Sequence, residues 1–487
     1  MKLILADKSA GDPRAAGVTA ERLVNLYVAP EAEGSEAALA LYSVPGTRDF
    51  ATVPGPFLRD MVEVEGTLYA IVAGGLHSIA SSGAATYLAA VSDDVNTSMA
   101  GHRSGVTISS DGGYSLWDGT SLTQPGDGRI ATVGSVAFLD QYTMFGDGDG
   151  REVEWTEIGD PADRNATYFG TAEATDDKIR RIFPFGSYLL IFKSESGEIW
   201  SNTRRGGAAA FSRITGGAFD TGLLGFRLVC RGPNEVFFVG HDRTACIMAG
   251  GVPQVVSTPV VNEALRDEEA THCFYYEWLG HRFCAIRFSD RPAWVYDLSM
   301  GRWHERSSGV QHGPWDIICS AYCYGQWHLG SRTGRIYRLG VTPTDATGAL
   351  RRTCVSRTVY MDGERFTVPL LEVRGKWGTY GVEEIAPNWI QDELGFPITD
   401  EAGQPLLAEN EQGTQLHTRP GRIWCRFSRD GGKTFGLPKV RDIGGVGQYR
   451  ATSRFRHLGQ FRQLTAEVNL TDPVDVPLLS EANIEVA

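Results

Sequence analysis

The fold is decided by two short apolar runs, Tyr188-Leu189-Leu190-Ile191-Phe192 and Gly197-Glu198-Ile199-Trp200-Ser201, which are separated by a polar turn. Each run is short for a helix and contains aromatic or β-branched residues, so the pair predicts a β-hairpin. The same pattern of strand, polar turn and strand returns along the chain, and helix signals are rare. We therefore expect an all-β protein.

The strand-and-turn unit recurs every 39 to 50 residues. A drifting period in this range, with about four short strands per unit, is typical of β-propeller blades. A β-sandwich also contains short strands and turns, but it would not repeat one motif seven times. We predict a β-propeller of six or seven blades between about residues 20 and 342. Its markers are Tyr69, Tyr114, Val153, Trp200, Cys246, Tyr296 and Tyr337.

The pattern changes after Gly340, where residues 341–348 have the Pro, Gly and Asp content of a linker. Longer alternating strands follow, which favours a β-sandwich. We predict a propeller at residues 1–342, including an N-terminal closing strand, and a C-terminal β-sandwich-like domain at residues 343–487. This second domain carries an acidic insertion at residues 382–420.

Composition limits the class of protein. Of the 487 residues, 42% are hydrophobic and 58 are glycine, which suits a large core and many tight turns. The formal net charge of -13 argues against a protein that coats DNA. No run of 18 apolar residues occurs, so we expect no membrane span. The first eight residues lack the apolar core of a signal peptide, so we expect assembly in a cytoplasm.

Motifs of the common enzyme families are absent from the sequence: there is no GxSxG elbow, HExxH pair, Walker A loop or kinase motif set. We expect no enzyme activity, catalytic residue, cofactor or metal site. Asp147, Asp149, Glu152 and Glu154 could surround calcium, but a solvated hairpin turn fits this Asp-Gly sequence better. The eight scattered cysteines indicate buried strand thiols in a reducing compartment. Histidines expected in turns or in the core are His102, His241, His304, His312 and His328.

Charge is unevenly distributed in the C-terminal part. Residues 382–420 hold eight acids and one base, whereas residues 421–462 hold ten bases and two acids. Either these segments contact partners of opposite charge, such as neighbouring subunits or passing DNA, or they neutralise each other within one domain. The candidate partner-interface residues are Arg422, Arg426, Arg450, Arg454, Arg456 and Arg462.

A single stretch, Ser428-Arg429-Asp430-Gly431-Gly432-Lys433-Thr434-Phe435, resembles the Asp box of sialidases and related propellers. In those families the box is a structural hairpin turn, not a catalytic element. The resemblance therefore implies a structural turn formed by Ser428, Asp430, Gly432, Thr434 and Phe435.

Short sequence blocks lie in a consistent order along nearly the whole chain. They occupy residues 23–27, 43–47, 153–161, 168–179, 189–192, 198–200, 450–456, 458–462, 472–474 and 482–485. In this order they resemble the tail hub proteins of short-tailed bacteriophages, which are also called nozzle, packaged-DNA stabilisation or tail accessory proteins. The acidic insertion at 382–420 matches poorly.

This resemblance implies a structural virion protein that forms a homo-oligomeric, hexameric ring in the phage tail. The ring would sit below the portal and adaptor proteins, contact tail fibres or spikes, and retain packaged DNA until ejection. Genomic DNA would pass through its channel without sequence-specific binding, and assembly would take place in the cytoplasm of the host bacterium. The alternative is a receptor-binding or glycan-degrading, sialidase-like propeller with Arg, Glu and Tyr clustered at its axis.

Overall fold

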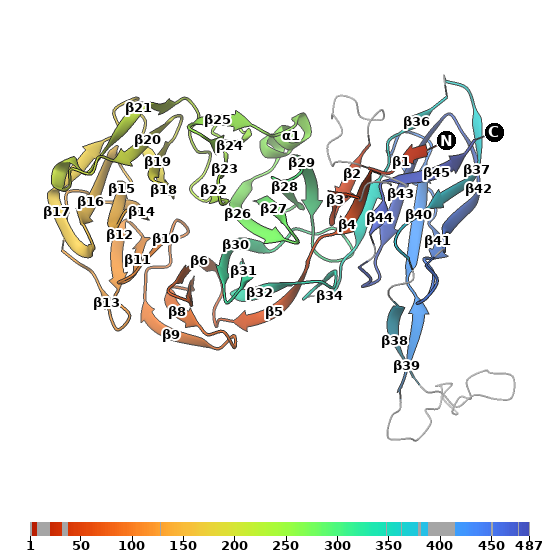
Figure 1. Cartoon of the computed structure of the whole chain (residues 1–487), viewed down its shortest axis with the longest axis horizontal. Helices are drawn as coiled ribbons and strands as arrows, with labels where there is room; N and C mark the ends of the chain where they lie inside the picture. The colour runs from red at the N-terminus through yellow and green to blue at the C-terminus, as the bar shows by residue number, and fades with distance from the viewer. Residues whose placement is uncertain are drawn as a thin grey trace.

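The computed structural model contains a ring of small sheets beside a second body of longer strands (Figure 1). It describes residues 2–6, 20–31, 38–126, 128–346, 348–361, 363–377, 381–387, 414–449, 451–475 and 477–486. The all-β prediction of a propeller followed by a β-sandwich is confirmed.

Seven antiparallel blades, each with four strands, form the ring within the described part of the chain. Blade one contains β6 (Leu58–Val64), β7 (Thr67–Val72), β8 (Gly75–Ile79) and β9 (Ala85–Ala90). Blade two contains β10 (Ser98–His102), β11 (Gly105–Ser110), β12 (Gly113–Trp117) and β13 (Leu122–Thr123). Blade three contains β14 (Val133–Leu139), β15 (Tyr142–Asp147), β16 (Glu152–Glu157) and β17 (Asp160–Thr171). Blade four contains β18 (Ile179–Phe185), β19 (Tyr188–Lys193), β20 (Gly197–Asn202) and β21 (Phe211–Phe219), with a short 3-10 helix at Gly207–Ala209.

The remaining blades complete the ring. Blade five contains β22 (Val229–Arg231), β23 (Val236–Val239), β24 (Ala245–Ala249) and β25 (Val252–Val255), and α1 (Pro259–Asp267) follows it. Blade six contains β26 (Ala270–Trp278), β27 (His281–Phe288), β28 (Ala293–Asp297) and β29 (Arg302–Arg306). Blade seven contains β30 (Ile317–Cys323), β31 (Gln326–Ser331), β32 (Arg335–Gly340) and β5 (Gly46–Thr52). Six of the seven sequence markers lie on the third strand of their blade, and Tyr69 lies on the second.

The apolar runs follow from burial on both faces of each blade. In β19, Leu189 and Ile191 pack into the core shared with blade three, while Leu190 and Phe192 pack into the core shared with blade five. A middle strand covered on both sides needs apolar residues at successive positions, so it loses the alternation of a half-exposed strand. All eight cysteines are buried and lie on strands, as predicted.

β5 closes the ring by joining two segments that are far apart in the sequence. It pairs antiparallel with β32, with Gly46 opposite Gly340 and Thr52 opposite Arg335. Gly46 is required by close approach, since a Cβ there would lie 2.0 Å from the carbonyl oxygen of Thr342. Blade seven thus takes its outermost strand from the N-terminal end of the propeller segment and its other three strands from the C-terminal end. All four strands of this blade are therefore present.

The C-terminal body is a sandwich of two sheets. One sheet has the order β1 (Lys2–Ile4), β45 (Glu481–Glu485), β37 (Phe366–Val373) and β42 (Ser453–Phe461). The facing sheet contains β35 (Arg352–Val355), β43 (Gln463–Leu470), β40 (Arg422–Ser428) and β41 (Lys439–Asp442), with β36 (Val359–Tyr360) on β43. Leu371, Phe455 and Val468 are among the buried residues between them.

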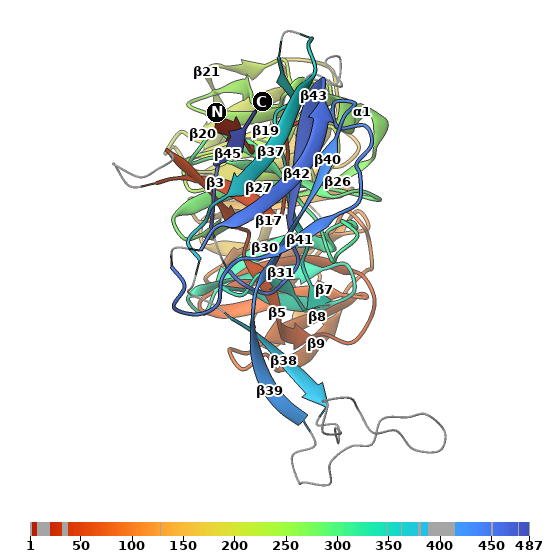
Figure 2. The same ribbon diagram turned by 90° about the vertical axis from the view of Figure 1, so that its right-hand side faces the viewer.

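Smaller sheets flank the sandwich. β3 (Leu26–Pro30), β4 (Leu39–Ser43) and β44 (Leu478–Leu479) form one, and β33 (Thr344–Asp345) pairs with β34 (Gly348–Ala349). β38 (Gly381–Pro387) and β39 (Thr414–Pro420) form a hairpin that projects from the sandwich (Figures 1 and 2). The predicted acidic insertion at 382–420 includes this hairpin, but its residues 388–413 lie outside the described residues.

One continuous sheet joins the propeller to the sandwich. β2 (Arg22–Val24) pairs in parallel with β29 of blade six and antiparallel with β35 of the sandwich. The sheet therefore runs from β26 to β41. Three N-terminal strands, β1, β2 and β4, each pair with a strand of the C-terminal part; β3 pairs with β4, and β5 pairs with the propeller. The division of the chain at residue 342 remains a prediction.

Blade three contains a buried ion pair beside an exposed one. Glu154 accepts hydrogen bonds from Arg164 Nε at 3.0 Å and Nη2 at 2.7 Å, and both side chains are at most 4% exposed. Glu152, two residues earlier on β16, pairs with Arg129 in the same two-pronged manner but is 26% exposed. These carboxylates, which could have joined a calcium site, therefore bind arginines, and Asp147 accepts the Asp149 amide in a turn.

Glu154→Ala should destabilise the propeller far more than Glu152→Ala does. The first change leaves the Arg164 guanidinium buried without its partner and should cost about 3–5 kcal/mol of unfolding free energy. The second removes a solvent-exposed pair and should cost less than about 1 kcal/mol. Urea unfolding followed by tryptophan fluorescence measures both variants, and equal losses would contradict this assignment.

Candidate functional site

The predicted interface arginines differ in how closely they are paired with carboxylates. Arg426 makes a bidentate ion pair with Glu467 of β43, with Nη2 2.7 and 2.8 Å from the two carboxylate oxygens. Arg454 donates to Glu372 of β37 at 2.8 Å. These two charges are therefore neutralised by neighbouring strands of the sandwich, and their role as partner contacts remains a prediction.

Arg422, Arg456 and Arg462 are exposed. Arg422 lies 3.7 Å from Asp442, a long and solvated pair. Arg456 and Arg462 have no ion pair among the residues that the structure describes. Arg450 lies outside the described residues.

Basic side chains also cover the open edges of the two sandwich sheets. β41 and β42 are each the last strand of their sheet. Lys439 of β41 donates to the carbonyl oxygens of Arg456 and His457 at 3.1 and 3.2 Å, and Arg441 donates to that of Arg454 at 3.0 Å. Side-chain donors on edge carbonyls block the addition of a further strand, so part of the predicted positive charge protects the edge.

Four large apolar side chains on β41 and in the loops before and after it are exposed. Leu437 is 90% exposed, Tyr449 70%, Val446 65% and Val440 47%. Together with Arg422 and Arg456, these four residues form what we call the β41 surface. Exposed apolar groups among arginines have the composition of a protein–protein contact.

The stretch from Ser428 to Phe435 forms a tightly hydrogen-bonded turn between β40 and β41. Asp430 Oδ1 accepts the backbone amides of Lys433 and Thr434 at 3.0 and 2.9 Å, and Ser428 Oγ accepts the amide of Gly432 at 2.8 Å. Hydrogen bonds from Ser428 and Thr434 lower the pKa of Asp430. The Arg426 guanidinium lies 5.3 Å from the centre of the Phe435 ring, so the turn is tied to the outer face of the sandwich.

A buried polar network ties the propeller to the sandwich, and sequence reasoning did not find it. Asn25 donates to Ser307 Oγ and to the carbonyl of Arg351, both at 2.7 Å. His312 lies in a turn, with Nδ1 2.9 Å from Ser307 Oγ and Nε2 2.9 Å from Thr353 Oγ1. One imidazole thus bridges the end of blade six and β35, and burial lowers its pKa to about 4.

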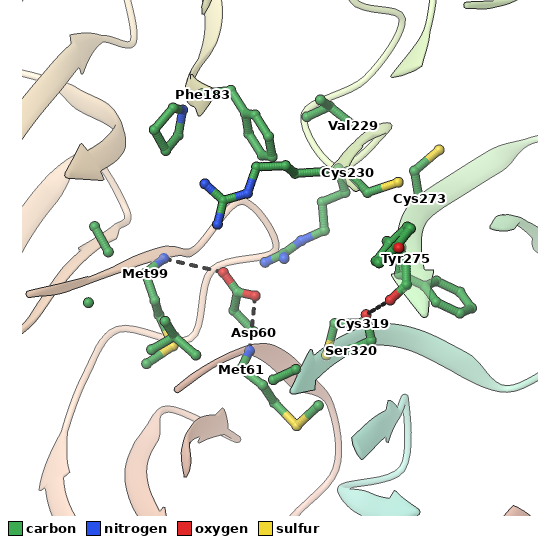
Figure 3. Close-up of a pocket in the computed structure, with 18 of the residues that line it drawn as sticks. Asp60, Met61, Met99, Phe183, Val229, Cys230, Cys273, Tyr275, Cys319 and Ser320 are labelled. Atoms are coloured by element: carbon green, nitrogen blue, oxygen red, sulfur yellow. Dashed lines mark hydrogen bonds between the residues drawn. The ribbon is translucent and has the colours of Figure 1, made fainter. Parts of the chain in front are cut away.

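A cavity of about 620 Å³ lies on the propeller axis, lined by residues from all seven blades (Figure 3). Around it, hydrogen bonds join each blade to the next, and we call these the inter-blade bridges. They are Asp60 to Met99 N, Ser98 to Val136 N, Ser135 to Ile182 N, Arg181 to Phe226 O, Arg227 O to Cys273 N, Ser320 to Tyr275 O, and Tyr324 to Ile79 O.

The cavity lining is charged, and none of its charged residues was singled out by number in the sequence. Asp60, Arg181 and Arg227 face it from three blades. Burial lowers the pKa of Arg181 to about 10 and also lowers that of Arg227. The glycan-degrading alternative expected Arg, Glu and Tyr at the axis; Glu63, Arg231 and Tyr275 do line the cavity, but the Tyr275 hydroxyl is hydrogen-bonded to Glu277. Among the described residues no cluster of metal-ligating side chains occurs.

No helix in the described ranges has the length and apolar character needed to cross a membrane.

Comparison with known proteins gives one family match. A family profile described as bacteriophage P22 Gp10, beta-propeller, matches residues 11–343, which include every propeller strand. No curated protein sequence matches the chain. A solved structure similar to it is the β-propeller domain of Cps50 (Swd1) from Myceliophteria thermophila, with 13% identity and a TM-score of 0.42 over 61% of this chain and 100% of that one. BamB from Moraxella catarrhalis is similar at 11% identity and a TM-score of 0.39, over 65% of this chain and 94% of that one.

The His312 bridge should make the propeller–sandwich junction sensitive to acid. Because its pKa is about 4 in the folded protein and about 6.5 when unfolded, the stabilisation is complete above pH 6.5 and is lost as the pH falls toward 4. Between pH 7.5 and 4.5 we expect the unfolding free energy of the wild type to fall by roughly 1–3 kcal/mol more than that of His312→Asn. Asn tolerates the positive φ of 55° at this position. Identical pH profiles in urea unfolding would exclude the bridge as the acid-sensitive group.

Proposed function

This chain belongs to the family described as bacteriophage P22 Gp10, beta-propeller, and on that premise we propose that it forms a hexameric hub ring in a short phage tail. The family is one of structural phage tail proteins, so its place is the virion tail. In the proposed role the ring follows the portal and adaptor, extends the DNA channel and retains packaged DNA until ejection. The family match over residues 11–343 carries this proposal.

The propeller's shape supports a role as a rigid wall rather than a pore. Its axial cavity of about 620 Å³ has the size of a small-ligand site, so duplex DNA has no path through one propeller. The DNA channel would then lie between the copies of the ring. A subunit with a net charge of -13 repels the phosphate backbone, which suits a wall that DNA must pass without binding.

The β41 surface suits the contact with a neighbouring tail protein. Arg422, Arg456, Leu437 and Tyr449 are all exposed. Arginine and tyrosine are enriched in protein interfaces because each combines apolar area with hydrogen-bond donors. In this proposal the β41 surface binds an adaptor, a fibre or an adjacent hub subunit. The protein is assembled in the host cytoplasm, and the β41 surface becomes buried when the tail forms.

A premature stop codon in the phage gene tests the proposed hub role. Heads should package DNA and then lose it, with stunted tails visible by electron microscopy, because the tail channel is not sealed. DNA retention is measured by nuclease-resistant DNA per particle. Full heads that fail to adsorb would instead favour the receptor-binding alternative, and host-glycan release by purified protein would favour the glycan-degrading one.

Charge reversal on the β41 surface should block tail assembly without unfolding the protein. Arg456→Glu replaces an exposed cation, so a partner with acidic groups there should bind at least about tenfold less, and fewer particles should carry the hub. Arg103→Glu, an exposed change in the β10–β11 turn, is the matched control. Equal incorporation of both variants into virions, measured by mass spectrometry, would show that this surface makes no tail contact.

A further inference from the structure

The innermost strands of five blades share one irregularity that places a side chain at the ring centre. Each has a shift of register early in its pairing with the second strand. A β-bulge of this kind re-aims the side chain that follows it. The residues directly after the shift are Asp60, Ser135, Arg181, His272 and Cys319.

Asp60 and Ser135 accept backbone amides of the next blade, whereas Arg181 offers more donors than its bridge uses. Asp60 accepts the amides of Met61 and Met99 at 2.9 and 3.2 Å, one on each carboxylate oxygen. Ser135 accepts the amide of Ile182 at 3.0 Å. Arg181 donates from Nη1 to the carbonyl of Phe226 at 3.0 Å, and a guanidinium has five N–H groups. Among the described residues its other donors have no hydrogen-bond partner, and the residue lines the cavity.

Arg227 reaches the same place from blade five. Its Nε and Nη2 donate to the carbonyls of Val95 and Thr97, at 2.8 and 2.6 Å, so it ties blade five to the segment before blade two. Among the described residues, the Nη1 group of Arg227 has no hydrogen-bond partner. The ring of Phe226 lies 4.7 Å from the Arg181 guanidinium and 5.9 Å from that of Arg227, which places both cations around one aromatic side chain.

The two guanidinium charges are not neutralised at close range. Neither arginine forms an ion pair within 4.0 Å with any residue that the structure describes, and Asp60 already accepts two backbone amides. Partly buried cations of like charge favour the binding of an anion that brings its own acceptors.

His272 supplies a further unsatisfied group in the cavity lining. Its Nδ1 is buried and has no hydrogen-bond partner in the structure. Burial, together with Arg227, Arg287 and Arg181, lowers the pKa of this imidazole well below its usual value, so the ring is neutral at pH 7. In a neutral imidazole Nδ1 is either a donor or an acceptor, depending on the tautomer, so it can form one hydrogen bond with a polar atom of a bound molecule.

We propose that the axial cavity binds a small organic oxyanion, with its carboxylate or phosphate between Arg181 and Arg227 and its apolar part against Phe183 and Tyr275. The volume of about 620 Å³ is that of a small-molecule site, and the largely polar lining suits a charged rather than an apolar ligand. Figure 3 shows Phe183 at the top and Tyr275 at the right of the side chains drawn around the cavity. This proposal does not depend on the proposed tail function.

Isothermal titration of the full-length protein with benzoate and with phenyl phosphate tests the site. At least one of them should bind saturably, and the one that binds identifies the oxyanion. Arg181→Gln should weaken that binding about 10- to 100-fold, because a charge-assisted pair is lost. The matched control is Arg180→Gln, one residue earlier, which is exposed and outside the cavity lining, and which should leave the affinity unchanged.

A second variant keeps the test valid if Arg181→Gln does not fold. Arg181→Lys retains the charge but not the fork-shaped donor set, so it should bind more weakly than wild type while its melting temperature reports an intact ring. The proposal fails if neither anion binds, if Arg181→Gln binds as well as the wild type, or if uncharged benzyl alcohol binds as tightly as the anions.

Discussion

The ring depends on hydrogen bonds that join each blade to the next. A blade buries both faces of its middle strands, but apolar contact between faces does not fix how one blade is rotated against its neighbour. The inter-blade bridges do, because each ends on a particular backbone atom, such as Met99 N for Asp60 and Ile182 N for Ser135. A buried amide left without its acceptor is costly, so every bridge selects one arrangement of two blades.

The same principle of fixed polar contacts extends to the sandwich. β2 pairs with β29 on one side and with β35 on the other, so both bodies share a sheet. Asn25 then bonds to backbone groups of Ser307 and Arg351, and His312 links the hydroxyls of Ser307 and Thr353. Propeller and sandwich are thereby held in one arrangement, which is what a subunit of a closed ring requires. The exposed β41 surface lies at the other end of this shared sheet.

The sequence predicts the features that repeat and misses those that depend on distant partners. Trp200 and Tyr296 could be recognised because burial on both faces leaves a periodic apolar pattern. A closing strand near the N-terminus was expected, but its register with β32 leaves no local trace, since the partners are almost 300 residues apart. Arg426 and Arg454 were singled out as surface charges, and only the fold shows that Glu467 and Glu372 lie opposite them. Arg181 sits in an apolar strand where a bulge breaks the alternation, so its direction could not be inferred.

The pairing of β1 with β45 has a consequence for synthesis on the ribosome. Residues 2–4 find their partners only at residues 481–483, so the first strand made waits for nearly the last. At about 5–20 residues per second this delay is roughly 25–100 s. During that time β1 remains an unpaired edge while the blades can form in order. Completion of the sandwich is thus a late kinetic event, and only chains that already include β45 present the complete sheet.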